Sequence, residues 1–343
     1  MIYSTYILYN VELLNKNSKK CGNMPKENQF KKATNSNLQK ANKVKNDEFY
    51  TQLADIEKEL RHYKEHFKNK VVFCNCDDPR ISNFFHYFSY NFEKLGLKKL
   101  ITTCYKNQSR DLFSENQSDK AIWLEYTGDK NGDKVPNPEE IGVHELQGDG
   151  DFRSKESIEL LKQADIVVTN PPFSIFREYI AQLIEYDKHF LILGNINAIS
   201  YKEIFKQIKE DKMWLGYNTV RFFNQPNGTI FETARTFWFT NLDIKKRHEE
   251  IPLYKSYNEN EYPKYDNYDA INVDKTKDIP MDFKGEMGVP ITYLDKYSPE
   301  QFEIIGQMAT TKIDEFNYGY PYVNGSKIYA RIIIKNKKLG TNL

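Results

Sequence analysis

The segment Asn170-Pro171-Pro172-Phe173 combines residue types that could activate a weakly nucleophilic amine. The exocyclic amine of adenine is such a group, because its lone pair is delocalised into the ring. An asparagine side-chain oxygen and a neighbouring backbone carbonyl could both accept hydrogen bonds from this NH2 group and localise the lone pair for attack on a methyl sulfonium. Pro171 fixes the backbone and leaves a carbonyl without a competing N–H donor. Phe173 offers a ring on which an extruded base could stack.

A plain turn between a strand and a helix would account for the same four residues without any chemistry. Their position favours the chemical interpretation, since they directly follow the apolar run DIVVT at 165–169. Such a run is typical of a strand that is buried on both faces. Open α/β sheets bind ligands at the carboxyl ends of their strands, which is where Asn170 would lie.

Asp151 and Phe152 form a second candidate pair, just beyond a strand predicted at 142–146. The Asp151 carboxylate could accept a hydrogen bond from the adenine amine of a cofactor, while Phe152 packs against the ring. The alternative is an aspartate that only caps a turn. Because the pair precedes Asn170 in the chain, we favour the cofactor role.

The run Asn75-Cys76-Asp77-Asp78 ends the first predicted strand, where the methionine end of the cofactor would bind. A glycine-rich turn usually serves there, because the backbone must approach the ligand closely. This sequence has no such glycine. The alternative is that Asp78 merely caps the next helix.

Hydrophobic periodicity predicts the elements that would position these residues. Strands are predicted within 71–79, 98–105, 142–146, 165–170, 189–195 and 233–242, and helices within 53–67, 81–96, 155–163, 176–184 and 201–211. Residues 106–142 are polar and turn-rich, which indicates a loop or hairpin insertion. This alternation predicts an α/β fold with a mostly parallel, twisted sheet and helices on both faces.

Charge and composition suggest how the chain is divided. Residues 16–45 hold nine lysines and one glutamate, a local charge of +8, so the rest must sum to −7 to give the net charge of +1. A basic arm at 1–45 could touch phosphates, although a solvated tail is the alternative. We expect a catalytic domain at 46–242, a recognition region at 243–334 and a tail at 335–343. The stretch 243–305 is rich in Tyr, Lys and Asp and is predicted to be a variable module outside the sheet core.

Several classes of protein are disfavoured. The four cysteines do not form a disulfide framework in a chain of 343 residues, and the lone CxC at Cys74 and Cys76 does not predict a metal site. His62 and His66 have metal-ligand spacing but no evident third ligand. No stretch approaches the roughly 20 apolar residues of a membrane span. We therefore expect a cytoplasmic protein without bound metal.

The sequence resembles the EcoRI-type adenine-specific DNA methyltransferases over about 34–334. The segments that carry the resemblance are KNDEFYTQ (45–52), KVVFCNCDDPRISNFFHYF (70–88), GLKKLI (96–101), DIVVTNPPFS (165–174), LILGNINAISY (191–201), FWFTNL (237–242) and MGVPITYLDKY (287–297). NPPF occurs widely in amino-methyltransferases, whereas FCNCDDPR is far more specific to this family.

The resemblance implies a Rossmann-like methyltransferase fold that uses S-adenosylmethionine. The implied cofactor-binding residues are Phe49, Tyr50, Thr51, Asn75, Cys76, Asp77, Asp151 and Phe152. Asn170, Pro171, Pro172 and Phe173 would form the catalytic segment, and Arg153, Phe223 and Trp238 would contact DNA or the flipped base. The family's usual start corresponds to Met24, so we expect translation to begin there.

The implied substrate is an adenine in double-stranded DNA, modified either by half of a restriction–modification pair or by an orphan enzyme. A cognate endonuclease would act on the same site without forming a stable complex, and we expect a monomer, because one methyl transfer per visit is compatible with it. Two alternatives stay open. The same turn could methylate another planar amine, such as an RNA base or a protein glutamine. The missing glycine turn could instead mark an inactive relative that only binds nucleic acid.

Overall fold

The computed structural model describes residues 50–76, 82–103, 121–133, 135–137, 139–224 and 229–339. Contacts divide the chain into residues 1–40 and 41–343, and every described residue belongs to the second unit. The expected basic arm at 1–45 lies outside the described residues, as do Phe49 and Asp77.

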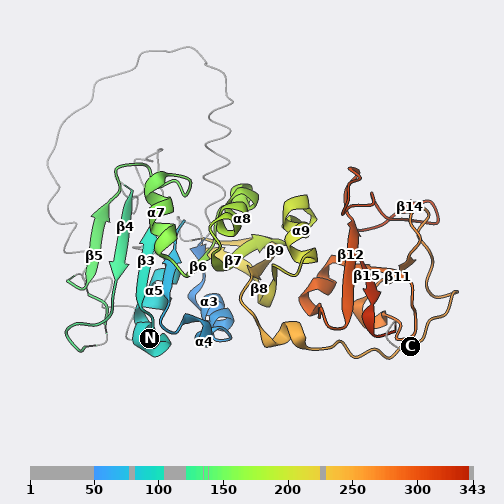
Figure 1. The fold of residues 1–343 in the computed structure, drawn as a ribbon, viewed down its shortest axis with the longest axis horizontal. Helices are drawn as coiled ribbons and strands as arrows, with labels where there is room; N and C mark the ends of the chain where they lie inside the picture. Colours follow the sequence, from blue (N-terminus) through green and yellow to red (C-terminus); the bar gives the residue numbers. More distant parts are fainter. Residues whose placement is uncertain are drawn as a thin grey trace, which may run out of the picture. The chain divides into compact units, whose positions relative to one another are not determined.

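Nine strands of the described chain form one mixed sheet (Figure 1). In spatial order they are β1 (Tyr50–Thr51), β8 (Trp214–Asn224), β9 (Ile230–Thr240), β7 (His189–Asn195), β6 (Ile166–Thr169), β2 (Val71–Cys74), β3 (Lys99–Thr103), β4 (Ile122–Tyr126) and β5 (Ile141–Glu145). The neighbours β7, β6, β2 and β3 are parallel to one another. Every residue of β6 is buried, so the prediction that this strand is buried on both faces is confirmed, and every residue of β2 is buried as well.

The prediction of a mostly parallel sheet is wrong outside these central strands. On one side β3 pairs antiparallel with β4, and β4 pairs antiparallel with β5. On the other side β9 pairs antiparallel with both β7 and β8. Of these pairs, β4–β5 and β8–β9 join strands that are consecutive in the chain, without a crossover helix between them. Within the described chain, the predicted strand at 142–146 corresponds to β5, an edge strand that pairs with β4, and β4 itself lies within the polar stretch 106–142.

The helices cover both faces of the sheet, as predicted (Figure 1). Their bounds are α3 (Leu53–Leu60), α4 (Lys64–Phe67), α5 (Asn83–Tyr90), α6 (Phe92–Leu95), α7 (Lys155–Gln163), α8 (Phe176–Glu185) and α9 (Lys202–Lys209). Val72 belongs to the buried cluster that includes α3 to α6, whereas Phe73 belongs to the cluster of α7 to α9. Successive residues of a strand point to opposite faces, so each central strand contributes to both clusters.

Helix α5 begins later than the sequence suggested. Its N-cap is Ser82, whose hydroxyl accepts a hydrogen bond from the Phe85 amide at 3.5 Å. A cap side chain bonds to the backbone two or three residues further on. The N-cap of α5 is therefore Ser82, and Asp78 lies outside the described residues.

The residues after 243 contribute the strands of a second sheet, separate from the nine-stranded one. Its four strands in the described chain are β10 (Ile271–Asn272), β11 (Glu286–Pro290), β15 (Arg331–Asn336) and β12 (Phe302–Met308). Ile332, Ile333 and Ile334 are fully buried in its centre. Long irregular connections separate the short strands and hide their periodicity. Strand β15 also runs past the expected boundary at 334.

A histidine at the start of this region is held between two carboxylates. His248 ends the short helix η3 (Lys245–His248), and its ring nitrogens lie 2.7 Å from Asp243 Oδ1 and 2.7 Å from Glu300 Oε1. Glu300 lies two residues before Phe302, where β12 begins. The two carboxylates raise the pKa of His248 above its ordinary value.

The raised pKa predicts a pH-dependent contribution to stability. Protonated His248 stabilises the folded chain fully below its unfolded pKa of about 6.5, and this contribution is lost as the pH rises through the higher folded pKa. We expect His248→Gln to lower the free energy of unfolding more at pH 6 than at pH 9. Solvent exposure limits the difference to about 0.5 kcal/mol. Urea unfolding at both pH values measures it, with His189→Gln as control, and a pH-independent loss would contradict the prediction.

Candidate functional site

The segment Asn170-Pro171-Pro172-Phe173 lies directly after β6, as predicted. Asn170 and Pro171 are buried, while Pro172 and Phe173 are half-buried. Phe173 begins the short helix η1 (Phe173–Ile175), which leads straight into α8. The sheet therefore presents this segment at the carboxyl edge of its central strands.

Asn75, which follows β2, is tied to the segment around Asn170 by hydrogen bonds. The Thr169 hydroxyl donates to the Asn75 carbonyl, and the Tyr179 hydroxyl donates to Asn75 Oδ1. The Cys76 thiol also donates to Asn75 Oδ1, at 3.6 Å. β2 and β6 are parallel neighbours, so their carboxyl ends must meet at one edge. The structure thus brings together two segments that are about a hundred residues apart in sequence.

Cys76 has the backbone conformation that a glycine normally supplies. Its φ angle is +81°, in the left-handed region that residues with a side chain rarely adopt. Such strain tends to persist at ligand-binding sites, where the surrounding structure enforces it. Cys76 therefore takes a glycine-like conformation at the end of β2, although no glycine is present there.

Asp151 and Phe152 are held against α8. The Phe152 ring centroid lies 5.3 Å from that of Tyr179, and Gln182 Nε2 donates to the Phe152 carbonyl at 3.0 Å. Both Asp151 oxygens accept from the Arg153 guanidinium, at 2.9 and 2.7 Å. These hydrogen bonds lower the pKa of Asp151, so its carboxylate stays ionised near neutral pH. Asp151 and Phe152 are therefore linked to Asn75 through Tyr179.

Arg153 forms hydrogen bonds with two carboxylates. Besides Asp151, its guanidinium donates to Glu178 Oε2 at 3.0 Å. The pair of anionic partners raises the pKa of Arg153 further above its already high value. The side chain is still more than half exposed, at 57%. Its contact with DNA or with the flipped base stays a prediction.

Tyr50 and Thr51 form β1, which is one edge strand of the nine-stranded sheet, and β5 is the other. Thr51 pairs with Phe223 of β8, and Asn83 Nδ2 donates to the Thr51 carbonyl at 2.7 Å. The Thr51 side chain is buried, and its hydroxyl has no hydrogen-bond partner within the described ranges. Such a hydroxyl costs free energy unless a ligand or water satisfies it.

Phe223 and Trp238 are core residues in this structure, although the resemblance implied contacts with DNA. Both side chains are completely buried. The Trp238 ring packs edge-on against Phe84 of α5, with centroids 6.1 Å apart. The inward side of β8 and β9 faces α3 and α5, so these rings have no surface with which to touch a nucleic acid.

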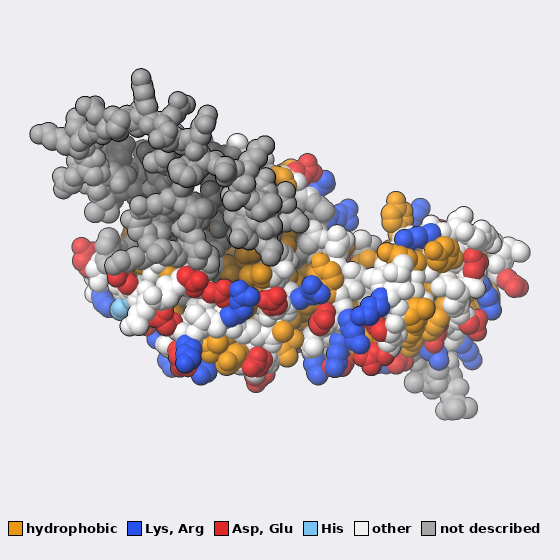
Figure 2. Space-filling model, turned by 90° about the horizontal axis from the view of Figure 1, so that it is seen from above, with side chains coloured by type: hydrophobic (Ala, Val, Ile, Leu, Met, Phe, Trp, Pro, Cys, Tyr) orange, Lys and Arg blue, Asp and Glu red, His pale blue; other side chains and the backbone are white. Residues whose placement is uncertain are grey.

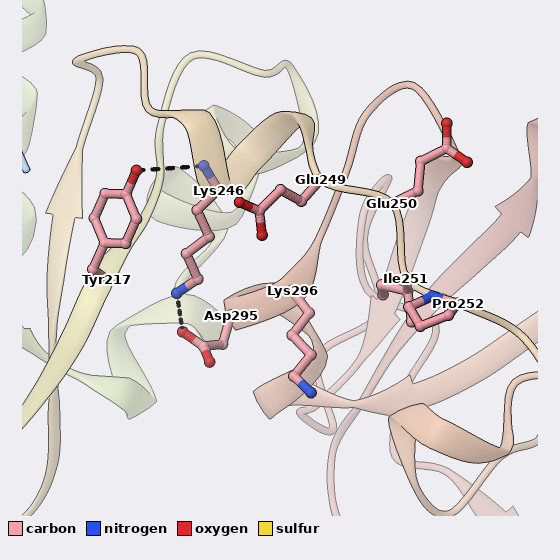
Figure 3. Close-up of a pocket in the computed structure, with 8 residues that line it drawn as sticks. All are labelled: Tyr217, Lys246, Glu249, Glu250, Ile251, Pro252, Asp295 and Lys296. Atoms are coloured by element: carbon pink, nitrogen blue, oxygen red, sulfur yellow. Dashed lines mark hydrogen bonds and ion pairs between the residues drawn. The ribbon is translucent and has the colours of Figure 1, made fainter.

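A cavity of about 440 Å³, drawn in Figure 3, has none of the expected site residues in its lining. It is lined by Tyr217, Lys246, Glu249, Glu250, Ile251, Pro252, Asp295 and Lys296. Lys246 Nζ donates to Asp295 Oδ1 at 2.6 Å and to the Gly216 carbonyl at 2.7 Å. These bonds join β8 to the helical turn η5 (Ile291–Lys296), so the charged lining serves to connect the two sheets.

Sequence reasoning missed the part played by helix α8. Tyr179, Gln182 and Glu178 contact the candidate cofactor segments, yet the amphipathic pattern assigned Tyr179 only to the core face. A tyrosine among the apolar positions of the helix that follows a catalytic segment is the signal that could have found it.

None of the helices in the described part of the chain has both the length and the apolar character needed to cross a membrane. Among the same residues, no group of three or more His, Cys, Asp or Glu side chains is arranged to hold a metal ion.

Comparison with known proteins places the chain among bacterial DNA-modifying enzymes. The family model described as adenine-specific methyltransferase EcoRI matches residues 37–337. The Type II methyltransferase M.EcoRI of Escherichia coli is 52% identical over 90% of this chain and 98% of its own length. The Type II methyltransferase M.MgeORF184P of Mycoplasma genitalium is 43% identical over 88% of this chain and 98% of its own. M.MpnI of Mycoplasma pneumoniae, also a Type II methyltransferase, is 37% identical over 87% and 98%. No solved structure gives a significant match.

Proposed function

The chain belongs to the EcoRI family of adenine-specific methyltransferases, and we propose that it methylates N6 of an adenine flipped out of a specific site in double-stranded DNA. The observation that carries the proposal is the buried Asn170-Pro171 segment at the end of β6, next to the turn after β2. Both family membership and this arrangement support methyl transfer to an amine.

We propose that S-adenosylmethionine binds along the carboxyl edge of the central strands. The buried hydroxyl of Thr51 supports this assignment, because it has no partner within the described residues and a bound ligand could satisfy it. The ionised Asp151 is suited to accept a hydrogen bond from an adenine amine, and Phe152 is suited to pack on its ring. Cys76 supports a close approach of the backbone to the methionine end. When bound, the cofactor supplies the electrophilic methyl group.

The chain's own residues then prepare the target amine. The Asn170 side-chain oxygen and the Pro171 carbonyl each accept a hydrogen bond from one of its two N–H groups. These two hydrogen bonds favour a tetrahedral nitrogen. Phe173, half-buried at the start of η1, stacks on the extruded base. No ionised general base is required, because the methylated nitrogen is acidic and can lose its proton afterwards.

We propose that the regions outside the catalytic domain (46–242) bind DNA. Figure 2 shows Lys and Arg side chains interspersed with Asp and Glu over the described part of one face. A basic arm at 1–45 would add the concentrated positive charge that phosphate binding needs and would make binding strongly salt-dependent. The recognition region from 243, with its own sheet, would read base edges, followed by a short tail.

The relatives' Type II names support a protective role in restriction and modification. We propose that the protein acts as a cytoplasmic monomer, since one methyl transfer per visit needs one active site. A cognate endonuclease would act on the same site without forming a stable complex.

Sequencing of modified bases tests the proposal directly. The protein is expressed in host cells that lack DNA methylation, alongside an Asn170→Ala control. We expect N6-methyladenine confined to one short sequence motif and absent with the control. Unmodified DNA from cells that contain folded, cofactor-binding protein would favour an RNA base or a protein glutamine as substrate. A protein that also failed to bind cofactor would be an inactive relative.

A further inference from the structure

Tyr179 connects the two halves of the proposed cofactor site. It lies on α8, directly after the catalytic segment, and its side chain is completely buried. Its hydroxyl donates to Asn75 Oδ1, at the turn after β2. Its ring lies 5.3 Å from that of Phe152, in the segment after β5. One side chain therefore contacts the residues proposed to hold opposite ends of the cofactor.

We infer that Tyr179 is a positioning residue that fixes the Asn75 amide and the Phe152 ring for cofactor binding. The inference rests on the proposed function and extends it to a residue that does not itself touch the reacting atoms.

The hydrogen bonds around Asn75 determine which end of its amide can meet a ligand. Oδ1 accepts from both Tyr179 and Cys76, and the backbone carbonyl accepts from Thr169. With its acceptor oxygen engaged, Asn75 can offer only its NH2 group to a ligand. A carboxylate, such as the one at the methionine end of the cofactor, is a suitable acceptor for that donor.

Neighbouring residues of α8 hold the other cofactor segment in the same way. Gln182 donates to the Phe152 carbonyl, and Glu178 accepts from Arg153, which binds Asp151. Glu178, Tyr179 and Gln182 lie within about one helical turn of one another. Because α8 continues from the catalytic segment, the helix sets the spacing between the bound cofactor and the target amine.

Tyr179→Phe tests the inference, because it keeps the ring and removes the hydroxyl. We expect the Kd for S-adenosylmethionine, measured by calorimetry, to rise about tenfold, which is the usual effect of one buried hydrogen bond. Turnover at saturating cofactor should fall less than about threefold, and the Kd for DNA should not change. Tyr293→Phe is the matched control, since Tyr293 is equally buried and its hydroxyl has no partner among the described residues. That variant should bind cofactor like the wild type.

A double-mutant comparison separates positioning from general packing. If Tyr179 acts through Asn75, cofactor binding by Asn75→Ala/Tyr179→Phe should equal that of Asn75→Ala alone. Independent, additive losses would overturn the inference, as would an unchanged Kd in folded Tyr179→Phe. Should Tyr179→Phe fail to fold, Asn75→Ala alone decides, and undiminished affinity in that variant overturns the inference. A wild-type protein that binds no S-adenosylmethionine would defeat the proposed function itself.

Discussion

Asn170→Ala is expected to lower the turnover number by about 10²–10³-fold while leaving the affinity for S-adenosylmethionine nearly unchanged. The side-chain oxygen of Asn170 is proposed to accept a hydrogen bond that strengthens as the target nitrogen becomes tetrahedral. Its loss therefore raises the energy of the transition state more than that of the bound substrates. Transfer of a labelled methyl group to DNA measures turnover, and calorimetry measures cofactor binding.

Two further variants sharpen this test. Asn170→Asp keeps acceptor oxygens at the same position and should retain more activity than the alanine variant. Asn197→Ala removes an exposed asparagine from η2 (Ile196–Ser200), near the end of the neighbouring strand β7, and should behave like the wild type. Near-normal turnover by Asn170→Ala would exclude the proposed role of this side chain.

The largest effect on stability is expected from Glu59→Ala. Glu59 lies on α3, is completely buried, and accepts hydrogen bonds from Tyr63 Oη at 2.9 Å and from the Tyr217 and Asn218 amides at 2.8 Å each. The Asn218 side chain donates as well, at 2.8 Å. Burial raises the pKa of Glu59. Removal of the carboxylate leaves these buried donors without their acceptor, which should cost about 3–5 kcal/mol.

Urea unfolding of matched variants would test this value. Glu57→Ala changes an exposed glutamate on the same helix and should shift the free energy of unfolding by no more than about 0.5 kcal/mol. Glu59→Gln keeps one acceptor oxygen and should fall between the two alanine variants. Equal stability of Glu57→Ala and Glu59→Ala would contradict the prediction, because it would show that the buried hydrogen bonds of Glu59 make no net contribution to the free energy of unfolding.

Glu59 also explains why the sequence did not reveal β8. The register of β8 against β9 shifts between Leu215 and Thr219, and the Glu59 carboxylate binds the backbone at this irregularity. The backbone at Gly216 packs closely against neighbouring side chains. A Cβ atom there would lie 2.9 Å from Trp238 Cβ and 2.9 Å from the Tyr63 hydroxyl. The bulge interrupts the alternation of the strand, and its stabilising partner is more than 150 residues away in the chain.

The central fold could be predicted because its signals are local. Val71–Cys74 and residues 166–168 are continuous apolar runs, and each is followed by the polar residues that a ligand site needs. The chemistry of Asn170-Pro171 is likewise contained in neighbouring residues. The α8 contacts were not predictable in this way, because the Tyr179 hydroxyl meets Asn75 only after the parallel strands align. The second sheet was hidden by the long connections between its short strands.

The position of β1 has a consequence for how the enzyme is made. Thr51 joins the sheet by pairing with Phe223 of β8, so one of the earliest parts of the proposed cofactor site is held by a strand that the ribosome adds much later. Bringing Thr51 to β8 closes a long chain segment, which costs conformational entropy. The contacts that offset this cost form only once β8 and β9 are present. A nascent chain that ends before residue 214 has no strand to receive Thr51, so the site can be completed only late in synthesis. Cells would therefore gain modification activity only after most of the polypeptide has left the ribosome.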